Sequence, residues 1–184
     1  MTLVYLETSF LMSAMVTEDE NHHKTLPVLE KIRSGAYVGI VSRHAFNEIL
    51  DALRKKTPAD PKVKSTADPR VLHRLVDERY KEITGKIIAS RNVRIQDTPA
   101  PIVAVLLETM KLLMPARGTI KELRRCPICH SRYYYLDYDG PDHDDVLHLI
   151  IADKVGCDQL ITFDRDYNVL TGIPAYSHLA IKVL

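Results

Sequence analysis

Several features that mark whole classes of protein are missing from this sequence. No apolar run approaches the ~18–20 residues that a membrane-spanning helix needs, and there is no internal repeat or Gly-rich phosphate-binding loop. The three cysteines are few and odd in number, which argues against a secreted scaffold held by disulfides. The first residues, MTLVYLE, contain no basic segment and reach an acid at once, so we expect no secretory signal and a cytoplasmic protein.

The composition is that of an ordinary globular domain, with 46% hydrophobic and 27% charged residues. The length of 184 residues suits one domain with a buried core, and we predict a single domain over 1–184. The net charge of +1 does not by itself point to nucleic acid. Residues 117–132 are mostly basic and residues 137–166 mostly acidic, however. This asymmetry fits a phosphate-binding surface beside a metal site, and it fits two solvated patches equally well.

Short, continuous apolar runs alternate along the chain with stretches of helical periodicity. Strands that are apolar on both sides are typical of a parallel sheet covered by helices. We therefore predict a helix-rich α/β fold, a three-layer α/β/α sandwich with a central, mainly parallel sheet. We expect Thr8 or Ser9 to cap the first helix and Ser42 the third. The predicted strands are 3–6, 37–41, 93–95, 159–162 and 180–183, and the predicted helices are 10–16, 18–34, 42–53, 71–89, 101–114 and 142–155.

Two segments interrupt this alternation. Residues 57–69 hold three prolines and several charges, and we predict a loop there. Residues 115–140 contain the pair Cys126 and Cys129, and we interpret them as an inserted segment or lid. The pair resembles half of a zinc knuckle, but a structural zinc site needs four ligands. Either it binds Zn²⁺ with further donors or it is a loop with two free thiols; the candidate donors are His130, His143, Cys157 and a second subunit.

Four acidic residues stand where a parallel sheet would bring them together. Glu7 directly follows the first predicted strand, and Asp164 lies two residues after the fourth. Sites in open parallel sheets form beyond the carboxyl ends of the strands. Glu48 lies in the second turn of the third predicted helix, and Asp145 in the first turn of the last one. We therefore expect these four carboxylates to converge at one edge of the sheet.

Such a cluster is chemically suited to a hard divalent cation. Mg²⁺ and Mn²⁺ prefer oxygen ligands, and a bound ion lowers the pKa of its water and neutralises charge on a phosphate. Without a cation the carboxylates would repel one another. Each acid also has a structural interpretation. Asp142 and Asp145 match a helix cap, Asp164 matches a turn, and Glu48 matches a solvated helix face.

The motifs around these acids resemble those of PIN domains. Residues 4–11, VYLETSFL, are similar to the PIN opening, in which a strand ends in an acid followed by Thr-Ser. Residues 145–152, DVLHLIIA, then Gly156, then residues 160–167, LITFDRDY, resemble the C-terminal half of VapC-like PIN proteins, and this is the most specific signal. Residues 42–50, with the acid Glu48, are similar to the middle motif. The resemblance covers the chain from residue 3 to about residue 170.

The resemblance implies an endoribonuclease that hydrolyses RNA phosphodiester bonds with a water activated by Mg²⁺ or Mn²⁺. Carried over position by position, it implies Glu7, Glu48, Asp145 and Asp164 as catalytic residues and metal ligands. The first acid of the family is more usually Asp, so the longer Glu7 side chain would set the cation further out. The implied auxiliary residues are Thr8, Asp142, Asp144, Thr162 and Asp166.

The family context implies the toxin of a toxin–antitoxin pair, with a small antitoxin protein as partner, and a homodimer. A housekeeping PIN nuclease of RNA processing is the alternative that the inserted segment and the cysteine pair favour. A catalytically silent PIN scaffold that binds RNA or a protein is the other alternative, and the four acids in motif positions speak against it. Arg124, Arg125 and Arg132, beside a run of three tyrosines, are candidate contacts to single-stranded RNA.

Overall fold

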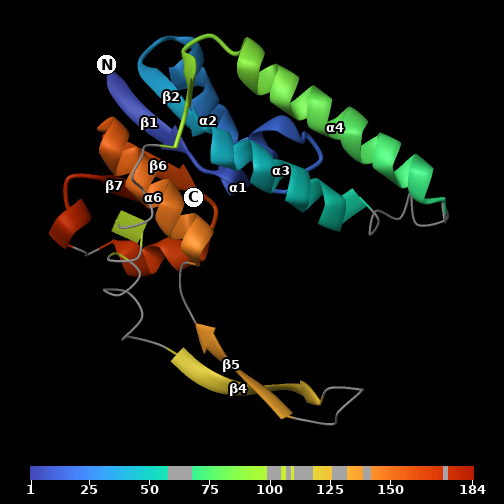
Figure 1. The fold of residues 1–184 in the computed structure, drawn as a ribbon. Helices are drawn as coiled ribbons and strands as arrows, with labels where there is room; N and C mark the ends of the chain where they lie inside the picture. Colours follow the sequence, from blue (N-terminus) through green and yellow to red (C-terminus); the bar gives the residue numbers. More distant parts are fainter. Residues whose placement is uncertain are drawn as a thin grey trace.

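The computed structural model of the chain has a five-stranded sheet between two layers of helices (Figure 1). The structure describes residues 1–57, 68–98, 105–106, 109, 118–125, 132–138, 142–171 and 174–184, with the backbone alone for 118–125, 132–138 and 174. The strands run in the order β3 (Val93–Gln96), β2 (Tyr37–Ser42), β1 (Thr2–Leu6), β6 (Gln159–Thr162) and β7 (Ala180–Val183), and every neighbouring pair is parallel. The predicted α/β sandwich with a parallel sheet is confirmed.

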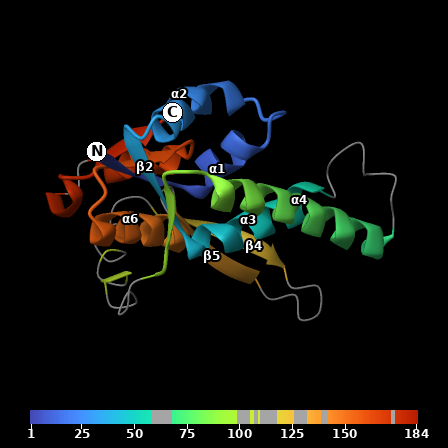
Figure 2. The ribbon, with the colours of Figure 1, turned by 90° about the horizontal axis from the view of Figure 1, so that it is seen from above.

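Four helices cover one face of the sheet. They are α1 (Thr8–Met15), α2 (His22–Arg33), α3 (Arg43–Lys56) and α4 (Pro69–Ala89). Val4 and Leu6 of β1 belong to an apolar core that includes buried side chains of all four helices. The helices α3 and α4 lie side by side, as Figures 1 and 2 show from two directions.

The opposite face is covered by α6 (His143–Val155) and two short 3₁₀ helices, η2 (Arg165–Leu170) and η3 (Pro174–Tyr176). Tyr5 lies between Val4 and Leu6 in β1, and it packs into this second core. Because successive side chains of a strand point to opposite faces, one strand supplies both cores. The helix α6 ends at Gly156, whose φ of 73° is the left-handed conformation that glycine adopts readily.

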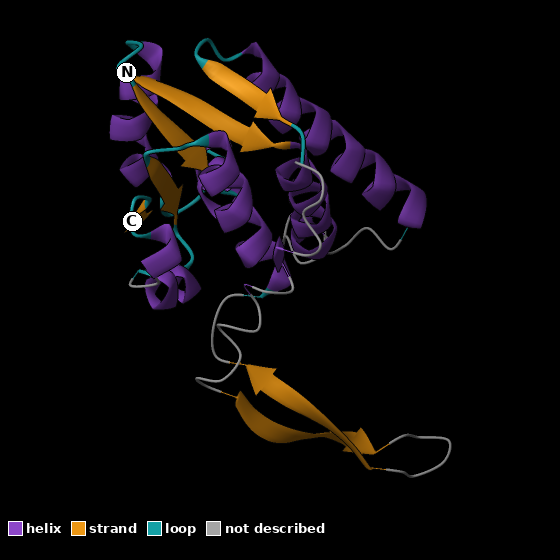
Figure 3. Cartoon of the chain, turned by 60° about the vertical axis from the view of Figure 1, so that its left-hand side comes forward, coloured by secondary structure: helices purple, strands orange, loops and turns teal. Residues whose placement is uncertain are grey.

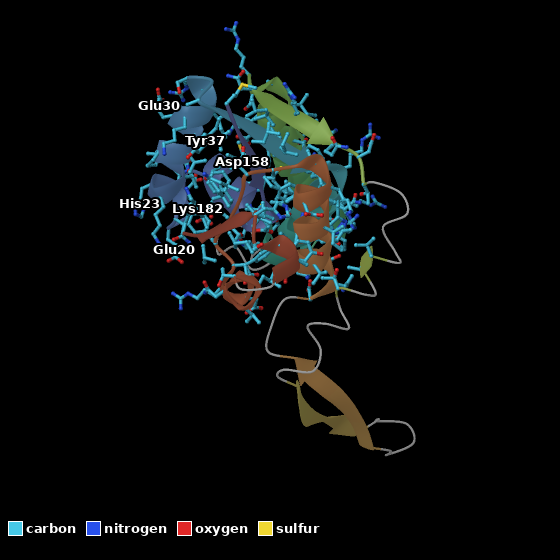
Figure 4. The ribbon with its side chains drawn as sticks, turned by 90° about the vertical axis from the view of Figure 1, so that its left-hand side faces the viewer. Glu20, His23, Glu30, Tyr37, Asp158 and Lys182 are labelled. Carbon is cyan, nitrogen blue, oxygen red and sulfur yellow. The ribbon has the colours of Figure 1, made fainter. Side chains whose placement is uncertain are left out.

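The helix α2 shows how helical spacing divides a surface helix. Val28 and Ile32 are buried, whereas His23 and Glu30 point away from the sheet into solvent (Figure 4). The helix begins at His22 and not at residue 18, as the sequence predicted. Residues 17–21 instead form turns, and the Asp19 carboxylate accepts a hydrogen bond from a backbone N–H two residues on, at 2.9 Å. Such local bonds compete with helix formation.

The cap of the first helix also differs from the prediction. The N-cap of α1 is Glu7, whose carboxylate accepts the Ser9 N–H at 2.8 Å, and not Thr8 or Ser9. Ser42 caps α3 as predicted. Most of the predicted loop 57–69 and of the predicted helix 101–114 lies outside the described residues. Among the helices that the structure describes, none is long and apolar enough to cross a membrane.

Residues of the predicted inserted segment form a separate antiparallel hairpin, β4 (Gly118–Arg125) and β5 (Arg132–Tyr138). Figure 3 shows this hairpin beyond the five-stranded sheet. The predicted zinc ligands Cys126 and Cys129 lie outside the described residues, and so do the side chains of Arg124, Arg125 and Arg132. The zinc site and the RNA-binding lid therefore stay predictions.

Candidate acidic active site

A cavity of about 650 Å³ opens where β1 and β6 end and where α3 and α6 bring in their own side chains. Parallel strands place their carboxyl ends on one edge, so segments far apart in the sequence meet there. The four acids that the sequence singled out all line this cavity. Its acidic lining residues include Glu7, Glu48, Asp145, Asp164, Asp142, Asp144 and Asp166.

Glu7 lies deepest among the four acids and is only 5% exposed. One carboxylate oxygen accepts hydrogen bonds from the Ser9 N–H, the Ser9 hydroxyl and the Thr162 hydroxyl, the last at 2.9 Å. Burial raises the pKa of Glu7, and the charge of His148 together with these hydrogen bonds offsets the rise only in part. The fold therefore holds this carboxylate in place at an electrostatic cost.

Asp145 enters the cavity from the first turn of α6. It forms a capping box with Asp142: the Asp142 N–H donates to the Asp145 carboxylate at 2.9 Å, and the Asp142 carboxylate accepts the Asp145 N–H at 3.1 Å. Burial, reinforced by the charges of Asp142, Asp164 and Glu7, raises the pKa of Asp145 to about 7. The capping interpretation and the active-site interpretation of this acid are therefore compatible.

Asp164 follows β6 and caps η2, with its carboxylate accepting the Asp166 N–H at 2.9 Å. Its own N–H donates to the Thr162 hydroxyl oxygen at 2.8 Å. That same hydroxyl donates to Glu7, so Thr162 links the two acids. Carboxylate oxygens of Asp145, Asp164 and Asp166 lie within 4.8 Å of one another. We call the group of Glu7, Asp145, Asp164 and Asp166 the carboxylate half of the site.

Glu48 has different surroundings. Its carboxylate accepts hydrogen bonds from the Thr8 hydroxyl and from Nε2 of His148, and its side chain is 23% exposed. Burial alone would raise the pKa of Glu48, but the hydrogen bond and charge of His148 and the Thr8 hydroxyl outweigh burial and lower it. His44 lies beside this pair and bonds Asp144 at 3.0 Å. We call the group of His44, Glu48 and His148 the histidine half of the site.

The donors of the carboxylate half suit Mg²⁺ or Mn²⁺. They are all hard oxygen atoms, which these ions prefer over the softer ligands that select zinc or copper. Burial and the charges of Asp142, Asp164 and Glu7 raise the pKa of Asp145, so positive charge beside Asp145 would favour its ionised form. A divalent cation would supply that charge, so the residues present fit such an ion.

Three further features of the cavity were not expected from the sequence. Ser9 was considered only as a helix cap, yet its hydroxyl donates to Glu7 and accepts the Phe163 N–H at 2.9 Å. His148 stands inside the DVLHLIIA motif, but no role was attached to it. Lys55 and Lys56 line the cavity from the last turn of α3. The sequence signal that could have pointed to these two lysines is their place in the basic last turn of α3.

No protein-family model matches the chain, and no curated protein sequence does so either. Among solved structures, the chain is similar to VapC20 of Mycobacterium tuberculosis, described as a toxin that cleaves the sarcin–ricin loop. The TM-score is 0.52 at 16% identity, covering 91% of this chain and 94% of that one. It is also similar to VapBC2 of Rickettsia felis, described as bound to a DNA fragment from its promoter. Here the TM-score is 0.53 at 13% identity, covering 98% of each chain.

The chain has a VapC-like PIN-domain fold. The resemblance drawn from the sequence motifs is thereby confirmed at the level of the fold. The similarity to VapBC2 extends over nearly the whole chain, and the acidic cavity lies at the carboxyl edge of the parallel sheet.

Proposed function

We propose that this chain is a divalent-metal-dependent endoribonuclease and the toxin of a toxin–antitoxin pair. The observation that carries the proposal is the crowding of Glu7, Asp145 and Asp164 in one cavity of a VapC-like PIN fold, with the pKa of Asp145 raised to about 7. Titratable groups with strongly shifted pKa values in a cleft are characteristic of functional sites. The similar protein VapC20 is itself a toxin that cleaves RNA at the sarcin–ricin loop.

Asp145 and Asp164 would hold the metal ion, with Glu7, Glu48 and Asp166 as further direct or water-bridged ligands. When bound, a Mg²⁺ or Mn²⁺ ion lowers the pKa of a coordinated water and offsets negative charge on the phosphate under attack. Asp145 has to release a proton before it can serve as an anionic ligand, because its pKa lies near neutrality. Glu48 is already ionised at that pH, because His148 and Thr8 lower its pKa.

Lys55 and Lys56 bring positive charge to the rim of the same cavity. Lysine side chains bind nucleic-acid phosphates largely independently of sequence, so they would hold the RNA backbone beside the acids. Arg124, Arg125 and Arg132 of the β4–β5 hairpin are proposed as additional RNA contacts on the basis of their sequence.

The test is cleavage of a pool of structured RNAs that includes the sarcin–ricin loop, with Mn²⁺ present. We compare the wild type with Asp145→Asn, and we use Asp153→Asn as the matched control. Asp153 lies on the same helix but bonds His178 at 2.9 Å, away from the cavity-lining acids. We expect Asp145→Asn to reduce cleavage on the order of 10³-fold and Asp153→Asn to leave it unchanged. Equal cleavage by all three proteins would refute the metal-nuclease proposal.

The toxin role is tested separately from the chemistry. Expression of the wild type should arrest growth, and co-expression of a small protein encoded by the adjacent gene should restore it. The β4–β5 hairpin and the cysteine pair favour the alternative of an RNA-processing PIN nuclease, which would cleave RNA without arresting growth. A silent scaffold would bind RNA or a protein partner without cleaving RNA at all.

Two assembly features complete the proposal. We propose a homodimer, and the molar mass of the purified protein by light scattering tests it. We also propose Zn²⁺ at Cys126 and Cys129, and metal analysis tests that: less than about half a zinc ion per chain would contradict it.

A further inference from the structure

A network of hydrogen bonds connects Glu48 to buried side chains, and the proposed function does not account for this network. Nε2 of His148 bonds the Glu48 carboxylate, and Nδ1 of His148 lies 2.5 Å from the Tyr5 hydroxyl. The Thr8 hydroxyl donates to the same Glu48 oxygen and lies 3.4 Å from Nε2 of His148. These hydrogen bonds therefore link β1, α6, α3 and α1 through side chains that meet only in the folded protein.

The burial of these groups points to a role other than substrate contact. Tyr5 and His148 have no exposed surface, and neither lines the described part of the cavity. Glu48 does line the cavity. His148 therefore reaches the cavity through its hydrogen bond to Glu48, and its charge also acts on Glu7.

We propose that His148 is a positioning residue that fixes the Glu48 carboxylate in the acidic cavity, and that Tyr5 fixes the ring of His148. The role of Glu48 in metal and RNA chemistry rests on the proposed function. The hydrogen bonds that join Tyr5, His148 and Glu48, which we call the clamp, can be measured without that function. A glutamate on a helix surface has several rotamers, and a partly exposed one gains solvation by swinging outward. A donor at Nε2 opposes that movement.

The two ring nitrogens of His148 have separate tasks. The partner of one nitrogen sets the proton position on the other, which is how outer partners orient histidines in many protein sites. An ionised carboxylate can only accept a hydrogen bond, so Nε2 carries the proton and donates it to Glu48.

A merely structural histidine would act on stability alone, and a double-mutant cycle separates the two roles. We compare His148→Leu, His148→Gln and Glu48→Gln, and the double variant of His148→Leu with Glu48→Gln, in Mn²⁺-dependent RNA cleavage. A thermal unfolding scan of each variant serves to check that the variant is folded. The matched control is His178→Leu, an exposed histidine that bonds Asp153.

We expect His148→Leu to lower cleavage about 10- to 100-fold, the range for removal of one partner of a charged hydrogen bond or of an outer-shell group. His148→Gln places an amide donor near the Nε2 position and should restore activity to within about 10-fold of the wild type. In the Glu48→Gln background, His148→Leu should cost less than about 3-fold. Full additivity of the two single losses would overturn the proposal.

The second readout does not need RNA. In NMR spectra of the ¹⁵N-labelled wild type, the ring N–H of His148 should give a slowly exchanging signal. That signal should vanish in His148→Leu and shift in both Glu48→Gln and Tyr5→Phe. If the chemical shift of the ring signal stays unchanged in Glu48→Gln, the proposed clamp is wrong, whatever the cleavage assay gives. If the wild type cleaves no RNA but the signal responds, the proposed function fails and the clamp stands.

Discussion

The carboxylate half and the histidine half of the acidic site both remove carboxyl groups from water, but they surround these groups with different neighbours. In the carboxylate half, burial raises the pKa values of Glu7 and Asp145. The charges of Asp142, Asp164 and Glu7 add to the rise at Asp145, whereas the charge of His148 and the hydrogen bonds at Glu7 offset the rise there only in part. In the histidine half, Glu48 is also removed from water, but it faces His148 and the Thr8 hydroxyl, so its pKa is lowered. Burial acts in the same direction on all three acids; the neighbours of Glu48 outweigh it, and those of Glu7 and Asp145 do not.

The difference assigns distinct requirements to the two halves. The histidine half contains its own counter-charge and is electrostatically satisfied by the fold alone. In the carboxylate half, the charges of other acids add to the effect of burial on Asp145, so this half gains most from a cation that comes from solution. Metal ions and pH should therefore act mainly on the carboxylate half.

The largest expected effect is stabilisation by a divalent ion. An ion at about 100 times its Kd stabilises the folded state by about 2.7 kcal/mol. For a chain of this size, that raises the Tm by about 5–10 °C. Asp164→Asn should abolish most of the rise that Mn²⁺ produces in a thermal scan, whereas Glu48→Gln should keep a larger part of it.

The control for this experiment is Asp153→Asn, which lies outside the cavity-lining acids and should behave as the wild type. Equal losses in Asp164→Asn and Glu48→Gln would remove the distinction between the two halves.

An intermediate effect is expected from pH in the absence of divalent ions. The pKa of Asp145 is about 7 in the folded protein, against an ordinary value of 3.8. Between these values the unfolded chain loses a proton that the folded chain retains. The free energy of unfolding should therefore fall as the pH rises from about 4 to about 7.

Chemical denaturation of the wild type and of Asp145→Asn at several pH values measures this slope. The variant should show a shallower fall over that pH range, and saturating Mn²⁺ should flatten the fall in the wild type. Parallel curves for the two metal-free proteins would show that Asp145 titrates as an ordinary surface acid.

The smallest expected effect concerns the histidine half. Thr8→Val keeps the shape of the side chain but removes one donor to Glu48. We expect a loss of about 1 kcal/mol in the free energy of unfolding at neutral pH, measured with urea. The exposed Thr17→Val serves as control, with a change within about 0.5 kcal/mol. A loss in Thr8→Val as small as that of the control would mean that His148 alone satisfies Glu48.

Much of the fold could be predicted from local patterns. The apolar runs of the five strands and the spacing of the helices are properties of short segments. The elements of the sheet and the helices that the structure describes lie within three residues of their predicted positions, except at the start of α2; the predicted helix 101–114 stays untested. That start was wrong because Asp19 bonds the nearby backbone, a choice that periodicity does not record. The cap of α1 was wrong because an acid at the strand end serves as both cap and cavity residue.

The site was predictable as a set of residue types but not as an arrangement. The sequence motifs singled out Glu7, Glu48, Asp145 and Asp164, because each acid follows a recognisable strand or helix start. The motifs could not show that the surroundings of Glu48 differ from those of the other three acids. That difference depends on His148, which lies 100 positions away in the chain and meets Glu48 only when α6 and α3 reach the same edge.

By itself, then, the sequence determined the strands of the parallel sheet, most of the helices around it and the resemblance to PIN domains, because these depend on periodicity and on short motifs; it did not predict the strands of the β4–β5 hairpin. Only the tertiary structure decided how deeply each acid is buried and which charges and hydrogen-bond donors surround it. The pKa of a carboxyl group depends on its surroundings in space, and the chain brings those surroundings from β1, α1, α3, α6 and the end of β6.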